Sequence, residues 1–114
     1  MAEVEKLISE YRQLLVDRAE MRQTPKLANR LYMQNRKIYR ILRESPDGRR
    51  AISALMKDPL IFVRLTAATQ SLQWEHDEAE QTLEAIELAS DAGLYAVSAK
   101  YVLMGWRDGT LDLE

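Results

Sequence analysis

Apolar residues recur at intervals of three and four along most of the chain, a spacing that places them on one side of an α-helix. Over about Glu3 to Arg22 the positions on that side are Val4, Leu7, Ile8, Tyr11, Leu14, Leu15 and Arg18. No segment alternates apolar and polar residues at every second position between turns, as a half-buried strand does. The pattern therefore predicts an all-α fold.

Each of the three prolines follows a residue that can cap a helix. In Thr24-Pro25, Ser45-Pro46 and Asp58-Pro59 the polar side chain can accept a free main-chain N–H, and proline in the first turn loses no hydrogen bond. We therefore expect helices over about 25–44, 46–57 and 59–72. The first of these should bury Leu27, Leu31, Ile38, Ile41 and Leu42.

Two further helices are expected near the C-terminus. Asp77 with Glu80 forms a candidate capping box for a helix that ends at Gly93, and a helix over 94–104 follows. Asp108-Gly109 indicates a turn. The residues expected to face the core from this part of the chain are Ala79, Leu83, Ile86, Ala89, Val97, Ala99, Val102, Leu103, and then Leu111 and Leu113, which fold back onto the last pair.

Six helices with short connections predict three antiparallel helical hairpins, and 114 residues is the length of one domain, 1–114. With 46% hydrophobic and 30% charged residues the chain should fold by itself. It contains no cysteine, which excludes disulfides and thiolate sites. No apolar run approaches the roughly 20 residues of a membrane span. We expect a cytoplasmic protein.

The stretch from Asp58 to Leu72 resembles a HEAT repeat, with Asp58 in a turn with proline, then Val63-Arg64 and the small pair Ala67-Ala68. More of the chain is similar to a small bacterial HEAT-like family described only as a domain of unknown function. The matching stretches are 29–32, 58–72, 73–74 and 79–86. The resemblance implies a HEAT-like α-α superhelix in which Asp58 and Arg64 are structural, and it implies no catalytic activity.

Charge is distributed unevenly along the chain. Residues 22–50 carry nine basic and two acidic side chains, a net charge of +7, and residues 75–114 carry two basic and ten acidic ones, a net charge of −8. Such a chain has two surfaces of opposite charge or an attraction between them.

The acidic part suggests a binding surface. Glu80, Glu84 and Glu87 lie at helical spacing, so their carboxylates share one side, and Trp106 can anchor a partner. A divalent cation is one alternative for this stripe and a plain solvated face is another. We interpret the chain as a protein-binding module with a basic protein partner, and an immunity- or antitoxin-like role is one concrete version of that function.

The basic part supports an alternative function, nucleic-acid binding by the helix over 25–44. Arg36, Arg40 and Arg43 could contact phosphates while Tyr39 stacks on bases. Pairing of the basic and acidic faces of two copies would instead give a homo-oligomer. The only histidine, His76, lies between Glu75 and Asp77, whose carboxylates could orient it as a general base or metal ligand, and an exposed loop residue is the alternative. With one histidine and no cysteine, the chain lacks the parts for a His-Cys zinc site or Cys-His catalysis. We expect no enzymatic activity, no cofactor and no metal.

Overall fold

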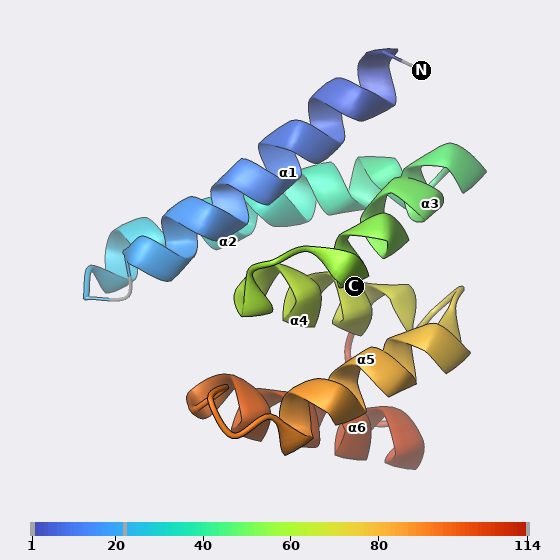
Figure 1. The fold of residues 1–114 in the computed structure, drawn as a ribbon. Helices are drawn as coiled ribbons and strands as arrows, with labels where there is room; N and C mark the ends of the chain where they lie inside the picture. The colour runs from blue at the N-terminus through green and yellow to red at the C-terminus, as the bar shows by residue number, and fades with distance from the viewer. Residues whose placement is uncertain (1, 22, 114) are drawn as a thin grey trace. The chain divides into compact units, whose positions relative to one another are not determined.

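The computed structural model describes residues 2–21 and 23–113, which contain helices and no strand. The elements are α1 (Ala2–Glu20), α2 (Pro25–Leu42), α3 (Pro46–Ala54), the short 3-10 helix η1 (Leu55–Lys57), α4 (Ile61–Ser71), α5 (His76–Leu88) and α6 (Leu94–Asp108) (Figure 1). The prediction of an all-α fold with six helices in hairpins is confirmed. The chain divides into two compact units, Met1–Ile52 and Ser53–Glu114, and the single domain over 1–114 stays a prediction.

In the first unit α1 and α2 form an antiparallel hairpin (Figure 1). Tyr11 and Leu15 are buried on α1, and Asn35, Tyr39 and Leu42 are buried on α2. The side-chain amide of Asn35 donates a hydrogen bond of 3.1 Å to the main-chain carbonyl of Tyr11. The hairpin is therefore held by apolar packing together with a polar link between Asn35 and Tyr11.

The prolines at the starts of α2 and α3 stand where the sequence predicts. Ser45 caps α3, because its Oγ accepts the N–H of Gly48 at 3.0 Å. Thr24 makes no such bond, so its predicted side-chain cap is wrong. Helix α2 begins at Pro25 without a side-chain cap. Gly48 faces the end of α2, since a Cβ at this position would lie 1.9 Å from the carbonyl oxygen of Leu42.

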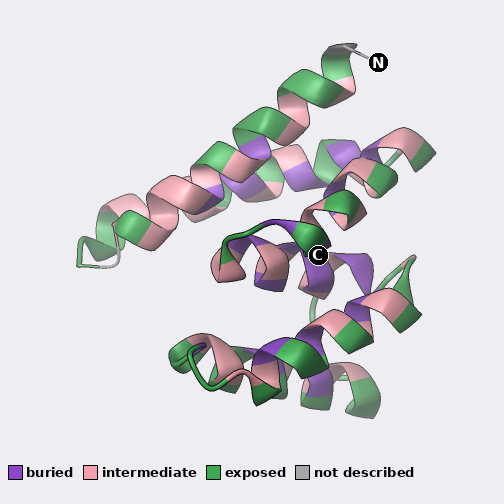
Figure 2. Ribbon diagram, in the orientation of Figure 1, coloured by how far each residue is buried: buried purple, intermediate pink, exposed green. Residues whose placement is uncertain are grey.

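In the second unit α4 contacts η1, α5 and α6, and α5 pairs with α6. Ala67 and Ala68 are fully buried, and these small side chains allow neighbouring helices to approach α4 closely. The rings of Phe62 and Tyr95 stack with their centroids 5.7 Å apart. Buried residues, coloured purple on the ribbon in Figure 2, recur along α4, α5 and α6. They include Val63, Leu65, Leu72, Ala79, Leu83, Ile86, Ala99 and Leu103.

The turn at Asp58-Pro59 differs from its prediction, because α4 begins at Ile61 and not at the proline. The Asp58 carboxylate accepts the N–H of Leu60 at 3.0 Å, which closes a local turn before the helix. Arg64 then donates to the carbonyls of Asp58 at 2.9 Å and Pro59 at 3.0 Å. Asp58 and Arg64 together tie this turn to the first turn of α4.

The last two helices also differ from their predicted limits. No side chain caps α5, so the capping box of Asp77 and Glu80 is wrong, and α5 ends at Leu88. Gly93 has φ +57° and precedes α6 instead of ending α5. The turn at Asp108-Gly109 is confirmed, since Gly109 has φ +79° and ends α6.

Leu111 folds back as predicted, because a Cβ at Gly105 would lie 3.3 Å from the Leu111 Cβ. The helices of the described residues include none that is long and apolar enough to cross a membrane.

Candidate functional site

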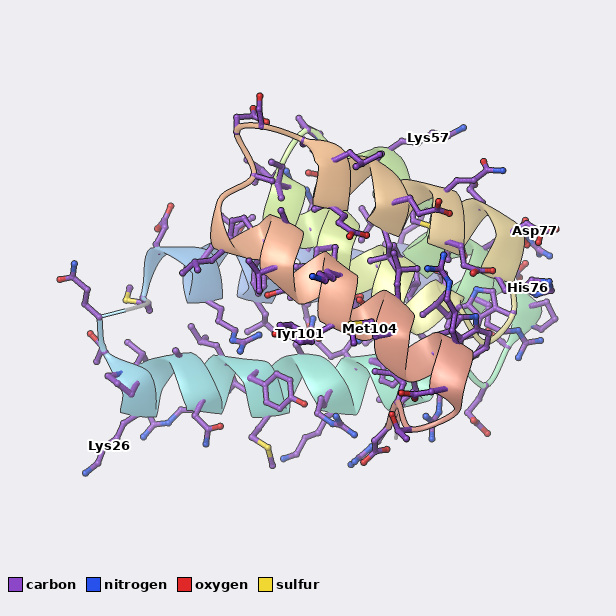
Figure 3. The ribbon with its side chains drawn as sticks, turned by 90° about the horizontal axis from the view of Figure 1, so that it is seen from below. Lys26, Lys57, His76, Asp77, Tyr101 and Met104 are labelled. Atoms are coloured by element: carbon purple, nitrogen blue, oxygen red, sulfur yellow. The ribbon has the colours of Figure 1, made fainter. Side chains whose placement is uncertain are left out.

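One side of α6 exposes a row of large apolar residues, which we name the α6 stripe. Its members are between 47% and 78% exposed, and they are Leu94, Val97, Tyr101 and Met104. Their spacing of three, four and three residues places them along one side of the helix. Figure 3 labels Tyr101 and Met104 along this helix.

Ala99 and Leu103 are buried on the opposite side of α6. The prediction that Val97 faces the core is therefore wrong, although Ala99 and Leu103 lie where expected. The helix is apolar on two sides, and α4 and α5 cover only one of them. Contiguous exposed apolar residues on a folded protein commonly mark an interaction surface.

The predicted acidic stripe on α5 is joined to α6 by one arginine. Arg107 Nε lies 3.6 Å from a carboxylate oxygen of Glu80, and Arg107 Nη2 lies 3.8 Å from one of Glu84. Glu87 is half-buried. The structure thus brings Glu80 and Glu84 together around a cation that sequence reasoning did not single out. Only the i+4 spacing of the two glutamates hinted that a single cation could contact both.

The second unit as a whole remains strongly acidic, because Ser53–Glu114 holds eleven acidic and four basic residues and so has a net charge of −7. Asp91 and Asp108 are exposed near the two ends of the α6 stripe. The stripe therefore combines exposed apolar side chains with negative charge at its ends, and one exposed cation, Lys100, lies beside Val97 and Met104.

Trp106, predicted as a partner anchor, lies inside α6 and is half-buried. It follows buried Leu103 by three residues, which places it toward the packed side of the helix and away from the stripe. The four stripe residues, and not Trp106, form the exposed apolar surface of α6.

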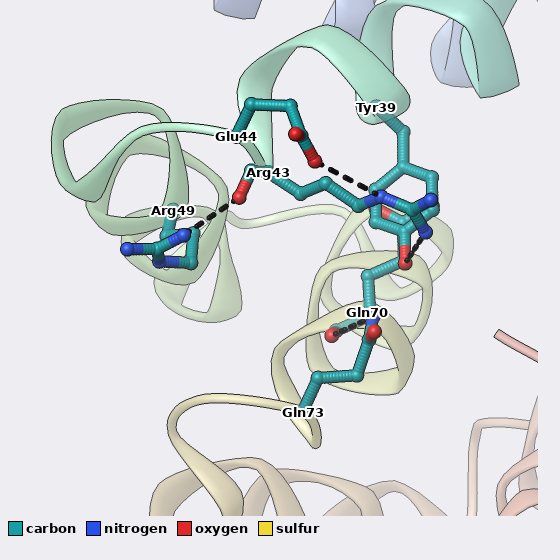
Figure 4. A network of polar contacts seen from close by, with 6 residues as sticks. All are labelled: Tyr39, Arg43, Glu44, Arg49, Gln70 and Gln73. Atoms are coloured by element: carbon teal, nitrogen blue, oxygen red, sulfur yellow. Dashed lines mark hydrogen bonds and ion pairs between the residues drawn. The ribbon is translucent and has the colours of Figure 1, made fainter. Parts of the chain in front are cut away.

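The residues proposed for nucleic-acid binding are largely engaged inside the first unit. Tyr39 is only 2% exposed, so its ring is not on the surface and cannot stack on bases as expected. Arg43 lies over this ring, 5.1 Å from the centroid, and donates to the Tyr39 hydroxyl at 3.3 Å (Figure 4). Arg43 Nε also lies 3.9 Å from a Glu44 carboxylate oxygen. Arg49 donates to the main-chain carbonyl of Arg43 at 2.8 Å.

Arg36 is held in a similar way. Its Nη1 donates to the Tyr32 hydroxyl at 2.8 Å, and the Arg36 and Arg18 guanidinium carbons lie 5.6 Å and 4.8 Å from the Tyr32 ring centroid. Arg40, in contrast, is exposed. Two of the three predicted phosphate-binding arginines therefore contact tyrosines of their own unit.

One side of α2 carries a row of exposed residues, which we name the α2 basic face. Helical spacing places its members on one side of α2, and they are Lys26, Arg30, Met33, Lys37, Arg40 and Ile41. Met33 is 52% and Ile41 57% exposed, so the prediction that Ile41 is buried is wrong. This face combines positive charge with two apolar side chains.

The single histidine of the chain lies on the protein surface. His76 is exposed at the start of α5, with Nε2 3.4 Å from an Asp77 carboxylate oxygen (Figure 3). Within the described chain, no three His, Cys, Asp or Glu side chains are grouped so as to hold a metal ion.

An open depression of about 550 Å³ between α1 and α2 is lined by Glu10, Gln13, Leu14, Gln34, Lys37 and Ile38.

Comparison with known proteins identifies a family whose function is unknown. No curated protein and no solved structure gives a significant match to the chain. Residues 5–105, most of the sequence, match the family described as a domain of unknown function (DUF2019), and the chain therefore belongs to that family.

Proposed function

We propose that this protein is a non-enzymatic protein-binding module and that its partner lies along the α6 stripe. The observation that carries the proposal is the exposure of Leu94, Val97, Tyr101 and Met104 on one side of one helix. Covering such a surface removes apolar area from water, which stabilises a complex by about 25 cal/mol per Å² before the costs of association.

The composition of the stripe supports a protein partner. Aromatic residues and methionine are enriched in protein interfaces, and the stripe contains Tyr101 and Met104. A stable interface needs about 800 Å² per partner, more than one helix side provides, so neighbouring polar residues would form its rim. Asp91 and Asp108 are exposed near the ends of the stripe and suit that rim.

The charge of the second unit favours a basic partner. A net charge of −7 attracts a positively charged protein over a distance of about one Debye length and speeds its association. Arg107 neutralises part of the field around Glu80 and Glu84, so those two carboxylates contribute to steering more than to direct contact. An immunity- or antitoxin-like protein that covers a basic toxin would be one member of this class.

We also propose that the helices form a HEAT-like scaffold. The contacts of Arg64 with the carbonyls of Asp58 and Pro59 support this proposal, because they fix the turn on which the resemblance depends. Such scaffolds present rigid helix faces to their partners. A rigid face loses little conformational entropy when it binds.

The proposal is tested by affinity capture with matched surface variants. The tagged protein and the variant V97K/M104K are incubated with lysate of the source cells, and co-purifying proteins are identified. The control is S9K/Q81K, which adds the same charge at two exposed positions on α1 and α5, outside the stripe. We expect a discrete protein that the wild type and the control retain and that V97K/M104K loses.

Nuclease treatment of a parallel sample separates protein binding from nucleic-acid binding. Partners that disappear with nuclease, and that depend on Arg40 and Lys37 but not on the stripe, would favour the nucleic-acid alternative. A set of partners identical for the wild type and V97K/M104K would contradict the proposed role of the α6 stripe.

A further inference from the structure

We propose that the partner that covers the α6 stripe is a second copy of this chain, which contributes its α2 basic face. This inference rests on the proposed function, since it names the partner of the same surface. It follows from a match between two surfaces that lie in different units of one chain.

The first element of the match is charge. Met1–Ile52 contains twelve basic and seven acidic residues, a net charge of +5, whereas Ser53–Glu114 has a net charge of −7. On α2 the exposed cations are on the same side as the exposed apolar residues Met33 and Ile41. Oppositely charged surfaces of two copies attract each other and are held in one register by their charges.

The second element is the distribution of exposed apolar residues. Apart from Leu60 and Leu88, every large apolar residue identified as exposed lies on the α2 basic face or on the α6 stripe. Both surfaces are single helix sides. At a rise of 1.5 Å per residue, the stripe from Leu94 to Met104 and the α2 segment from Arg30 to Ile41 each extend roughly 15 Å.

The third element is the arrangement of charge around the apolar residues. Lys37 lies four residues from both Met33 and Ile41, so a cation stands between the two apolar side chains of α2. Asp108 follows Met104 by four residues and is exposed at the end of the stripe. A helix pair that buries Met33 and Ile41 against the stripe can thus place cations of one copy near carboxylates of the other.

A reciprocal contact would close the assembly. If α2 of each copy lies on α6 of the other, a two-fold axis relates the contacts and the assembly closes as a dimer. If two copies made only one such contact, one α2 and one α6 would remain free on every pair. Further copies would then add to these free surfaces.

Sedimentation velocity of the full chain, from low micromolar to submillimolar concentration and at low and high salt, tests the proposal. We expect a dimer at low salt that weakens as salt rises. M33E/K37E should disrupt the α2 side and V97K/M104K the α6 side, each raising the dissociation constant by about tenfold or more, the effect of losing roughly 1.4 kcal/mol. The controls K6E and S9K/Q81K change exposed positions outside both surfaces and should leave the dimer unchanged.

Mixing the two defective variants identifies the partner surface. M33E/K37E retains α6 and V97K/M104K retains α2, so the mixture should form a heterodimer through one intact contact and associate more tightly than either variant alone. Failure of the mixture to associate while the wild type dimerises would overturn the pairing of α2 with α6. Circular dichroism of each variant checks that its helices are intact.

A monomer at every concentration and salt would overturn the second copy as the partner. The proposed function is judged separately, because stripe-dependent capture of a different protein would uphold it while the self-association proposal fails. A protein that stays monomeric and also captures no partner through the stripe would contradict both proposals.

Discussion

Asn35 donates its side-chain amide to the main-chain carbonyl of Tyr11, 24 positions earlier in the chain, at a distance of 3.1 Å. This bond joins α2 to α1, and Asn35 is only 3% exposed. In N35A the bond is lost and the space of the amide is left unfilled. We expect the free energy of unfolding to fall by about 1–3 kcal/mol.

Urea denaturation followed by circular dichroism measures this change. N29A is the matched control, because Asn29 is exposed on the same helix and should change stability by less than about 0.5 kcal/mol. Equal stability of N35A and N29A would show that the link between Asn35 and Tyr11 contributes nothing.

Gly48 is required by the close approach of the end of α2. Alanine in an open helix is more stable than glycine by about 0.5–1 kcal/mol, but a Cβ at Gly48 would lie 1.9 Å from the Leu42 carbonyl oxygen. Because that atom belongs to the main chain, the backbone must shift, and G48A should lose about 1–3 kcal/mol. G105A is the comparison, since its Cβ would lie 3.3 Å from the Leu111 Cβ and 3.5 Å from the Leu111 main-chain Cα and N, which is much less close. A stabilised G48A would contradict this packing.

Burial raises the pKa of the Tyr11 phenol well above its ordinary value, and nearby Tyr39 raises it further. Tyr11 therefore stays protonated in the folded state at a pH where it ionises in the unfolded chain. The stability that this difference provides is complete below about pH 10 and is lost as pH rises above it, by up to about 1.4 kcal/mol per pH unit.

Unfolding of the wild type and Y11F from pH 9 upward tests this dependence. We expect the wild type to lose stability more steeply with pH than Y11F, and one phenol to ionise only on unfolding, as read from phenolate absorbance. Parallel curves for the two proteins would contradict the effect.

Arg107 joins α6 to α5 through ion pairs that are exposed to solvent. Its side chain is 55% exposed and that of Glu84 is 53% exposed, so we expect R107A to lose less than about 1 kcal/mol. High salt should remove most of the difference, because salt screens exposed charges. R107K retains the charge and serves as the control. A large loss that salt does not reduce would mean that Arg107 acts through packing.

Helix starts could be predicted where the backbone alone decides them. Pro25 and Pro46 begin α2 and α3, since proline fits the first turn whatever surrounds it. Asp58-Pro59 has the same appearance, yet the Asp58 carboxylate takes the N–H of Leu60 and delays α4 until Ile61. A local side-chain bond in competition with a helical start is not visible in residue spacing.

The exposed faces could not be predicted for a related reason. On α2 the buried side includes the polar residue Asn35 as well as Leu42. The apolar pattern alone therefore favoured Ile41 as a core residue and left Tyr39 on the surface, whereas Tyr39 is buried and Ile41 is exposed. On α6 both Val97 and Leu103 are apolar, and only the packing of α4 and α5 decides which of them is covered. The α6 stripe is therefore a tertiary feature.

Site-specific photo-crosslinking in the source cells tests most directly whether the α6 stripe binds a partner. A photoreactive phenylalanine analogue replaces Tyr101 in the α6 stripe or, as control, Lys57, which is exposed outside it. We expect a discrete light-dependent adduct from position 101 and none from position 57, and the mass of the adduct distinguishes a second copy from another protein. No adduct from position 101, or the same adducts from both positions, would contradict a binding role for α6.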